Sequence, residues 1–403
     1  MSASLYPIRQ YGRKPAFSSF LPGVAGERGI PLWCFYVNRG QCIAGFGSRD
    51  KQHSIMEFSP AHTAYQRVQT TGFRTFVKVD GRVTEPFRDG LANMHIGENT
   101  LRLVWESQQD ALRMEISYFI VPDESIGMLA RRVTLVNTAD HPRQVEMLDG
   151  LAAIVPYGLS QFDLKMMCQT AKAWMMVEGF QSRLPYFRLR ASLVDTTSVE
   201  AIEDGSFGAA YADGARLPVV VDPAVVFGWD TSMDMPVGFE ENALHDLLEK
   251  PQRLEHELPC CFFGWEGELA DSVQLESVYG LSHGADAFHE AVQRLLTGGL
   301  DEKERKAECL LDGYLTAIET HTADPLFDRY CRQSYIDNFL RGGVPHLFKS
   351  GEKIRPFYLY SRKHGDLERD YNDFVVTPEY YSQGNGNYRD VLQNRRSDVR
   401  FCP

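Results

Sequence analysis

The sequence has no apolar run long enough to cross a membrane, since about eighteen consecutive apolar residues are needed and none occur. The residues from Met1 to Lys14 are polar, with several basic side chains, and lack the apolar core of a signal peptide. We therefore expect a soluble cytoplasmic protein without a membrane partner.

Basic residues are fewer than acidic residues. The chain has 42 Lys and Arg residues against 54 Asp and Glu residues, which gives a formal net charge of -12. The arginines are scattered among acidic residues and form no basic stripe. Because such a surface repels a polyanion, we exclude nucleic acid as a partner.

The cysteines form no metal or disulfide motif, because no CxxC pair occurs and no histidine lies at zinc-ligand spacing. The eight positions are Cys34, Cys42, Cys168, Cys260, Cys261, Cys309, Cys331 and Cys402. We expect reduced, mostly buried thiols and no metal site. Cys260 and Cys261 are adjacent in a strand pattern, so their side chains should point to opposite faces.

Common cofactor and nucleophile motifs are also missing, including a Walker loop, a GxSxG elbow and an HExxH pair. Gly384-Asn385-Gly386 follows no Val- and Ile-rich strand and lacks a third glycine, so it is no dinucleotide fingerprint. The acids Glu368, Asp370 and Asp373 lie near Arg369 and are more typical of a solvated loop than of a catalytic pair. We expect no organic cofactor.

The chain does have the length for two or three domains, at 403 residues. From about Leu32 to Gly280 the apolar residues alternate with polar ones, as in strands with one buried face. In the clearest run, 112–120, the even-numbered residues are apolar, and a second run covers 187–193. The polar stretch 137–142 contains a proline and is typical of a hairpin loop. These features predict an antiparallel β-sandwich.

After Ala285 the apolar spacing becomes helical, and the Gly298-Gly299 break separates two such stripes. Asp324-Pro325 then offers a side-chain cap and a proline at the first helical position, and Gly342-Gly343 ends that helix. We therefore expect a sandwich over residues 1–280, a helical linker over 281–322 and a helical domain that begins at 323.

The C-terminal stretch is polar, aromatic and rich in Gly, Asn and Tyr, and we interpret Lys349 to Asn387 as a long loop that forms part of a site. Between Thr377 and Asp398 most side chains can form hydrogen bonds, and such a mixture suits a neutral sugar. If a helix begins near Asp390, Arg389 and Gln393 point to one side and Arg396 lies elsewhere. An ordinary surface loop before a charged helix is an equal alternative.

Several segments resemble known carbohydrate enzymes. Gly29 to Gly40 resembles the first strand of the cellobiose phosphorylase superfamily. The segments 60–65, 72–76 and 148–158 look more like its β-1,3-oligoglucan phosphorylase branch. The stretch Tyr388 to Asn394 is similar to the sugar-binding motif of this family, where RDxxQD is common and where Asn394 here replaces the acid. The resemblance covers nearly the whole chain as the N-terminal portion of such an enzyme.

This resemblance implies an inverting glycoside phosphorylase, with a sandwich and helical linker followed by an (α/α)6 barrel that starts within 323–403. It implies an oligosaccharide and inorganic phosphate as substrates, no other cofactor, and a homodimer. The residues implied in sugar binding are Tyr388, Arg389, Asp390, Gln393 and Asn394. The general acid of the family lies beyond Pro403, so no carboxylate of this chain is assigned to it, and we expect the 403 residues alone to be inactive.

Two further interpretations remain open. Because the acid is missing, the chain could be a carbohydrate-binding module that holds sugar without turning it over. Alternatively, the sandwich could serve as a dimerisation scaffold. Exposed apolar side chains of the terminal helical region, such as Phe327, Tyr335 and Phe339, would need a covering partner in either case.

Overall fold

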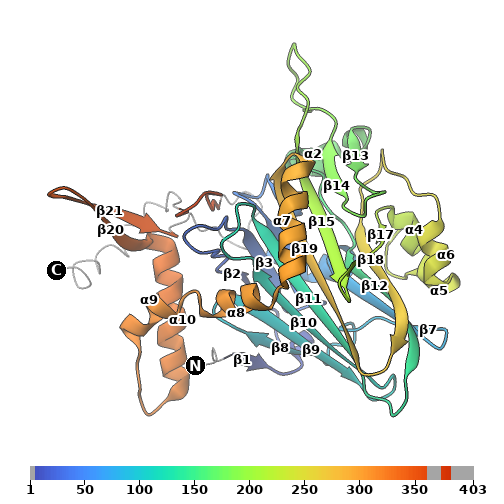
Figure 1. Cartoon of the computed structure of the whole chain (residues 1–403), viewed down its shortest axis with the longest axis horizontal. Helices are drawn as coiled ribbons and strands as arrows, with labels where there is room; N and C mark the ends of the chain where they lie inside the picture. The colour runs from blue at the N-terminus through green and yellow to red at the C-terminus, as the bar shows by residue number, and fades with distance from the viewer. Residues whose placement is uncertain (1–4, 361–373, 383–403) are drawn as a thin grey trace.

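The computed structural model describes residues 5–360 and 374–382. Three antiparallel sheets form a β-sandwich with helices on its outer faces, while helix α10 (Pro325–Gly342) and a β-hairpin stand together at one end (Figure 1). The predicted antiparallel sandwich is therefore confirmed. The start of an (α/α)6 barrel remains a prediction.

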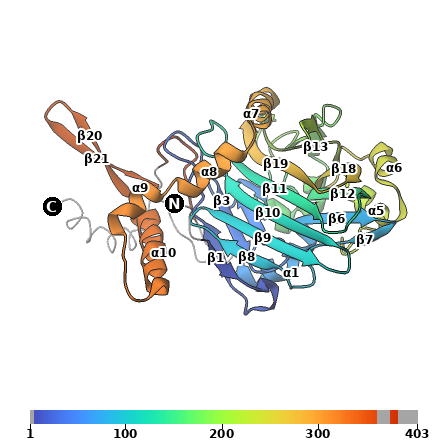
Figure 2. The ribbon, with the colours of Figure 1, turned by 60° about the horizontal axis from the view of Figure 1, so that its bottom comes forward.

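The large sheet has ten strands and forms one layer of the sandwich; its central strands are seen side by side in Figure 2. In spatial order its path is β1 (Tyr6–Ile8), β8 (Asn93–Ile96), β9 (Thr100–Ser107), β10 (Leu112–Ile120), β11 (Met128–Asn137), β19 (Ser272–His283), β15 (Asp204–Ala212), β14 (Tyr186–Leu189) and β13 (Met175–Glu178), with β16 (Ala215–Arg216) paired to β15.

Two smaller sheets form the opposing layer. The second sheet runs β17 (Val219–Val220), β18 (Cys261–Leu269), β12 (Arg143–Leu151), β6 (Phe73–Val79) and β7 (Arg82–Thr84). The third sheet runs β2 (Ser18–Leu21), β3 (Trp33–Val37), β4 (Ile43–Gly47) and β5 (Ser54–Met56).

The main core lies between the large sheet and the other two, and the alternation in the sequence identified its contributors. Leu112, Met114, Ile116, Tyr118 and Ile120 of β10 are all buried in this core, as predicted. The second predicted strand is shorter than expected, because β14 ends at Leu189. Beyond it, Ala191 makes only an isolated bridge to Ala201.

The stretch 137–142 is not a hairpin loop, and this prediction was wrong. It carries the chain from β11 in the large sheet to β12 in the second sheet. The turn between β18 and β19 makes the reverse crossing beside it. Asn137 joins the two crossings, because its side-chain amide donates to the backbone oxygens of His141 and Leu269. A sandwich corner and a hairpin have the same local turn chemistry, which explains the error.

A buried polar network ties the two layers together. Arg131 of β11 faces Asp149 of β12, with Nη2 to Oδ1 at 2.6 Å and Nε to Oδ2 at 3.1 Å, and both residues are at most 2% exposed. Arg131 also donates to Gln41 Oε1 at 2.6 Å and to Thr75 Oγ1 at 3.0 Å. Burial alone would lower the pKa of Arg131, but the charge of Asp149 outweighs it and raises that pKa further above its ordinary value.

Helices cover the outer faces of all three sheets. On the large sheet, α7 (Ala285–Gly298) buries Phe288, Val292 and Leu295, the face predicted from the sequence. The helices α4 (Pro223–Phe227), α5 (Val237–Glu241) and α6 (Leu244–Glu249) cover the second sheet. Helix α1 (Ala61–Thr71) covers the third sheet. Two short helices, α2 (Gln161–Met166) and α3 (Cys168–Lys172), lie near β13.

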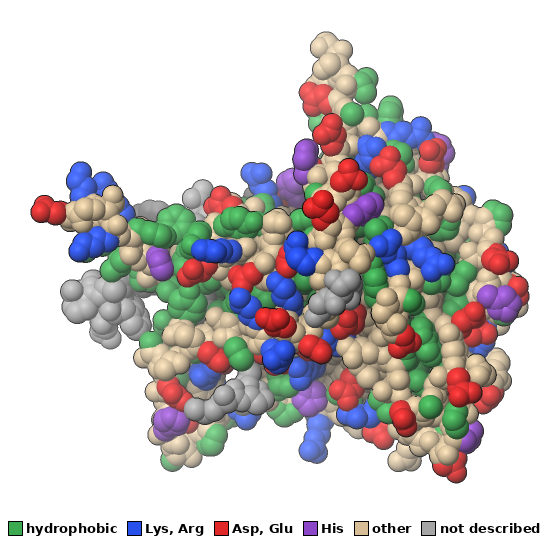
Figure 3. Space-filling view, in the orientation of Figure 1, with side chains coloured by type: hydrophobic (Ala, Val, Ile, Leu, Met, Phe, Trp, Pro, Cys, Tyr) green, Lys and Arg blue, Asp and Glu red, His purple; other side chains and the backbone are tan. Residues whose placement is uncertain are grey.

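Ion pairs add to the apolar contacts that attach the linker to the sandwich. Helix α8 (Asp301–Cys309) places Glu304 between Arg102 and Arg132 of the large sheet, at 3.1 Å and 2.6 Å. Acidic and basic side chains are intermingled on this face of the molecule (Figure 3). Helix α9 (Asp312–Leu315) and the short turn Thr316–Ile318 then lead to α10. As predicted, Asp324 caps α10, its Oδ1 accepting from the Leu326 amide at 2.9 Å.

The prediction of a continuous loop from Lys349 to Asn387 was wrong in its first part. Strands β20 (Val344–Ser350) and β21 (Lys353–Leu359) form an antiparallel hairpin instead. Pro345 and Pro356 lie within these strands, although proline donates no ladder hydrogen bond. A two-stranded hairpin has two open edges, where such a donor is not required.

The buried cysteines lie in or directly before strands. Seven cysteines lie in the described part of the chain as free thiols, and four of them are buried: Cys34, Cys42, Cys260 and Cys261. Cys261 packs into the main core and Cys260 into the cluster beneath α4 to α6, so the predicted opposite directions are confirmed. Among the described residues, no helix combines the length and apolarity that a membrane span requires.

The Arg131–Asp149 pair generates a stability prediction. Arg131→Met should lower the free energy of unfolding by roughly 3–5 kcal/mol, because it leaves the Asp149 carboxylate buried without its cation. The matched control is Arg113→Met on β10, since Arg113 is 42% exposed and pairs with Glu115 on the surface. The control should cost less than about 0.5 kcal/mol. Urea unfolding followed by circular dichroism measures both, and equal losses would refute the role given to the buried pair.

Candidate functional site

The five residues predicted to contact sugar lie outside the described residues. They are Tyr388, Arg389, Asp390, Gln393 and Asn394. The described residues nearest to them in sequence are 374–382, which we call the anchor segment because they are fixed to the sandwich. The surface around the anchor segment is therefore our candidate functional site.

Aromatic packing holds the beginning of the anchor segment. Phe374 is 4% exposed and lies among three aromatic rings of the sandwich. Its ring centroid is 5.1 Å from that of Trp33, 5.2 Å from Phe20 and 5.3 Å from Phe58. Centroid distances in this range are typical of favourable edge-to-face pairs. Burial of this aromatic side chain thus holds the start of the anchor segment against the third sheet.

Backbone hydrogen bonds continue the attachment. The Val376 amide donates to the Arg49 carbonyl oxygen at 2.7 Å, and the Tyr381 amide donates to that of Glu27 at 2.6 Å. The Tyr360 amide donates to the Ser382 carbonyl oxygen at 2.7 Å, which links the anchor segment to the end of β21. The anchor segment is therefore held near both of its ends.

Ionisable and hydroxyl side chains gather where Val376 meets the sandwich. We call this group the polar rim, and it comprises Arg49, Asp50, His53, Tyr157 and Asp204. Three of its members lie in the loop between β4 and β5, Tyr157 follows β12, and Asp204 begins β15. Residues from three different sheets thus meet at one edge of the sandwich.

The side chain of Asp50 binds two other residues of the β4–β5 loop. Its Oδ1 lies 2.7 Å from His53 Nδ1 and accepts from the Gln52 amide at 2.9 Å. Burial would raise the pKa of Asp50, but the hydrogen bond and charge of His53, the Gln52 amide and the charge of Arg49 together lower it. Asp50 is therefore ionised at neutral pH and does not suit a general acid, which must still hold its proton.

The pKa of Tyr157 is shifted upward, in the direction opposite to that of Asp50. Burial raises the pKa of Tyr157 to about 12, and the nearby charge of Asp204 adds to the effect. Its ring centroid is 6.1 Å from that of His53. Asp204 Oδ1 lies 2.6 Å from His283 Nδ1, and this contact raises the pKa of His283. At neutral pH the rim thus offers a protonated phenol beside carboxylates, a combination that donates to and accepts from hydroxyl groups.

The polar rim was not predicted from the sequence. One signal was present, since the six consecutive polar residues 48–53 separate two short apolar strands. Tyr157 was noticed only as part of a resembling segment. The described residues contain no group of three or more His, Cys, Asp and Glu side chains arranged to hold a metal ion.

No protein-family model matches the chain, and no curated protein matches it. Among solved structures, a bacterial glucoamylase complexed with acarbose matches with a TM-score of 0.42 and 8% identity, covering 86% of this chain and 43% of its own. A protein from the human microbiome named as a kojibiose phosphorylase matches with a TM-score of 0.28 and 6% identity, covering 84% and 33%. The chain thus spans less than half the length of either protein. At these scores the two likenesses assign neither family nor function.

The aromatic anchor predicts a local effect. Phe374→Ala should release the anchor segment and accelerate amide hydrogen exchange at Val376 and Tyr381 by roughly tenfold or more, because their hydrogen bonds lose the packing that shields them. Phe327→Ala is the control, since Phe327 is 50% exposed. Hydrogen-exchange mass spectrometry compares the two variants. Unchanged exchange in Phe374→Ala would show that this ring does not hold the anchor segment.

The Asp50–His53 contact predicts a pH dependence. Because folding lowers the pKa of Asp50, its contribution to stability is present above the unfolded value of about 4 and is lost as pH falls through the folded value. Asp50→Asn should therefore be less stable than the unchanged protein at neutral pH, with a difference that shrinks in acid. Urea midpoints measured between about pH 3 and 7 provide the test. A difference that grows in acid would give the opposite sign and contradict the assignment.

Proposed function

We propose that this chain is the N-terminal part of an inverting glycoside phosphorylase that converts β-linked gluco-oligosaccharides and phosphate to α-glucose 1-phosphate. The observation that carries the proposal is the stretch Tyr388 to Asn394, with its likeness to a sugar-binding motif. The proposed domains are a sandwich over 1–280, a linker over 281–322 and the beginning of an (α/α)6 barrel over 323–403, in which α10 is the first helix.

The described fold supports this proposal in two respects. An antiparallel sandwich is followed by linker helices and by a capped helix, in the order that the resemblance implies. In addition, the anchor segment precedes the proposed sugar-binding stretch and is fixed beside the polar rim. Support comes from sequence resemblance and local geometry, because the two structural likenesses are too weak to contribute.

The chemistry requires few protein groups. A phosphate oxygen attacks the anomeric carbon from the face opposite the glycosidic bond, the bond from that carbon to the leaving oxygen breaks, and the configuration inverts. One carboxylic acid gives its proton to the departing oxygen. Phosphate takes the place of the water and general base of an inverting hydrolase, so a single catalytic carboxyl suffices. We propose that this acid follows Pro403 in the complete protein.

The proposed role of this chain is to hold the donor sugar. Asp390 accepts from its hydroxyl groups, and Asn394 accepts from or donates to them. Arg389 and Gln393 bind neighbouring hydroxyls, and Tyr388 borders the same sugar. We further propose that the enzyme works in the cytoplasm as a homodimer, with inorganic phosphate as its only co-substrate.

Phosphorolysis assays on the complete gene product test the proposal. β-1,3- and β-1,4-linked gluco-oligosaccharides are incubated with phosphate, and glucose 1-phosphate is measured for each linkage. Formation of α-glucose 1-phosphate from either linkage supports the proposal. Absence of product from both refutes it, and saturable oligosaccharide binding without turnover would instead favour a carbohydrate-binding module.

A variant of the complete protein tests the sugar contact. Arg389→Lys should lower kcat/KM by roughly tenfold to a hundredfold, because lysine loses the planar fork that can bind two oxygens. Arg396→Lys is the matched control, since the expected helix directs Arg396 elsewhere. Equal kinetics for both variants would remove Arg389 from the proposed sugar site.

A further inference from the structure

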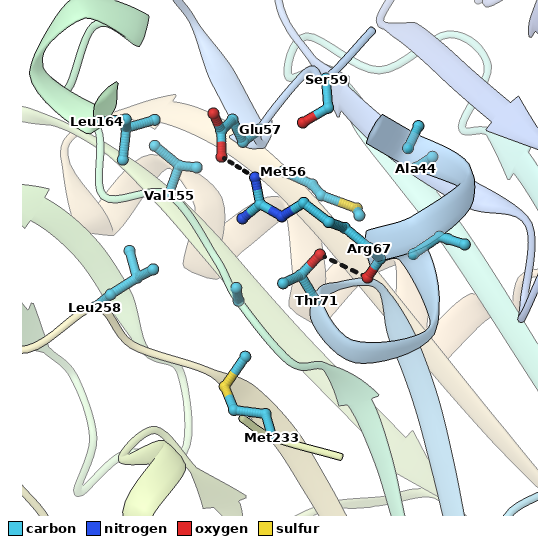
Figure 4. Close-up of a pocket in the computed structure, with 13 residues that line it drawn as sticks. Ala44, Met56, Glu57, Ser59, Arg67, Thr71, Val155, Leu164, Met233 and Leu258 are labelled. Atoms are coloured by element: carbon cyan, nitrogen blue, oxygen red, sulfur yellow. Dashed lines mark hydrogen bonds and ion pairs between the residues drawn. The ribbon is translucent and has the colours of Figure 1, made fainter. Parts of the chain in front are cut away.

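A pocket separate from the polar rim lies beneath helix α1. It has a volume of about 160 Å³ and is bordered by α1, the end of β5 and the segment that follows β12 (Figure 4). Apolar side chains form most of its wall, namely Met56, Val155, Leu164, Met233 and Leu258. Among the described residues no aromatic side chain lines it, so they give it no flat surface on which a sugar ring stacks.

One pair of opposite charges lies at this wall. Arg67 of α1 extends toward Glu57, with Nη1 to Oε2 at 3.7 Å, and the two are drawn between Ser59 and Thr71 in Figure 4. The two groups are close enough to form an ion pair, but the distance between them is too long for a hydrogen bond. The side chains of Arg67 and Glu57 are 49% and 23% exposed, so both remain accessible to a ligand that enters from solvent.

The apolar wall is held in place by buried contacts. Met56 and Val155 are each 4% exposed, and the Val155 amide donates to the Ile55 carbonyl oxygen at 2.8 Å. Met233 has a φ of 57°, and its carbonyl oxygen accepts from Arg74. Arg74 is itself buried and paired with Glu85 at 2.7 Å. The pocket is therefore lined by residues that the surrounding fold fixes.

Size and charge together limit the ligand. The volume is about that of the engineered 150 Å³ cavity that holds one benzene, so a side chain of roughly four to six heavy atoms would fit. A ligand with only a carboxylate would face Glu57, and one with only an ammonium group would face Arg67. A ligand that carries an ammonium group and a carboxylate on the same carbon can pair with both residues and adds no net charge to a partly dry site.

We infer that this pocket binds a small zwitterion, namely a free α-amino acid with an aliphatic or thioether side chain. The carboxylate pairs with Arg67, the ammonium group pairs with Glu57, and the side chain lies against Val155, Leu164 and Leu258. This inference does not depend on the proposed phosphorylase activity. Ala61, Ala64 and Val68 of α1 belong to the same apolar cluster as Phe374 and Val376, so the pocket and the anchor segment share one structural support.

Isothermal titration of the 403-residue chain with L-leucine and L-methionine tests the inference. Saturable binding is expected below about 10 mM. Two analogues keep the apolar part and only one charge each: 4-methylpentanoate lacks the ammonium group and 3-methylbutylamine lacks the carboxylate. Each should bind at least roughly tenfold more weakly than leucine. The inference would be overturned if either analogue bound as tightly as leucine, or if neither leucine nor methionine showed saturable binding.

Two variants tie the binding to the named residues. Arg67→Met and Glu57→Gln should each weaken leucine binding by roughly tenfold or more, since each removes one charged partner. Arg113→Met is the matched control, because Arg113 also belongs to a surface pair, with Glu115. Circular dichroism verifies that the variants are folded, and Arg67→Lys, which keeps the charge, should recover part of the affinity. Unchanged affinity in folded Arg67→Met would refute the site.

Discussion

The sandwich depends on a charged contact in a place where most proteins have only apolar side chains. Arg131 comes from the large sheet and Asp149 from the second sheet, while Gln41, between β3 and β4, extends the network to the third. Because a buried charge is costly without its partner, slipping either strand by one residue would separate both groups from their contacts. We infer that the network specifies how the three sheets register with one another, a constraint that apolar packing alone enforces less strictly.

The sequence predicted which face of each strand is buried, but not which sheet each strand joins. Alternation along 112–120 identifies the inward residues of β10 because the side-chain period of a strand is local. Sheet membership is not local: Asn137 ends a strand whose successor crosses to the opposite layer. The hydrogen bond from Asn137 to Leu269, which secures the crossing, joins residues far apart in sequence. The turn residues 137–142 suit such a corner and a hairpin equally.

The sugar-binding residues expected within 377–398 stay a prediction, because most of that stretch lies outside the described residues. The structure adds that residues 374–382 are anchored on the sandwich. The polar rim could not be assembled from sequence, because Asp50, Tyr157 and Asp204 belong to three segments that the sheet crossings bring together. Each residue by itself is an ordinary polar residue in a loop or at the end of a strand. Their shared electrostatics, which lower one pKa and raise another, exist only in the folded chain.

Helix α1 connects these features, because some of its side chains belong to both. Ala64 and Val68 line the pocket together with Arg67 and Thr71, and they also belong to the apolar cluster that contains Phe374. Small side chains at the contact positions let α1 approach the third sheet closely, while the pocket of about 160 Å³ adjoins the same helix. In this way the third sheet supports both the pocket and the segment that leads toward the proposed sugar-binding residues.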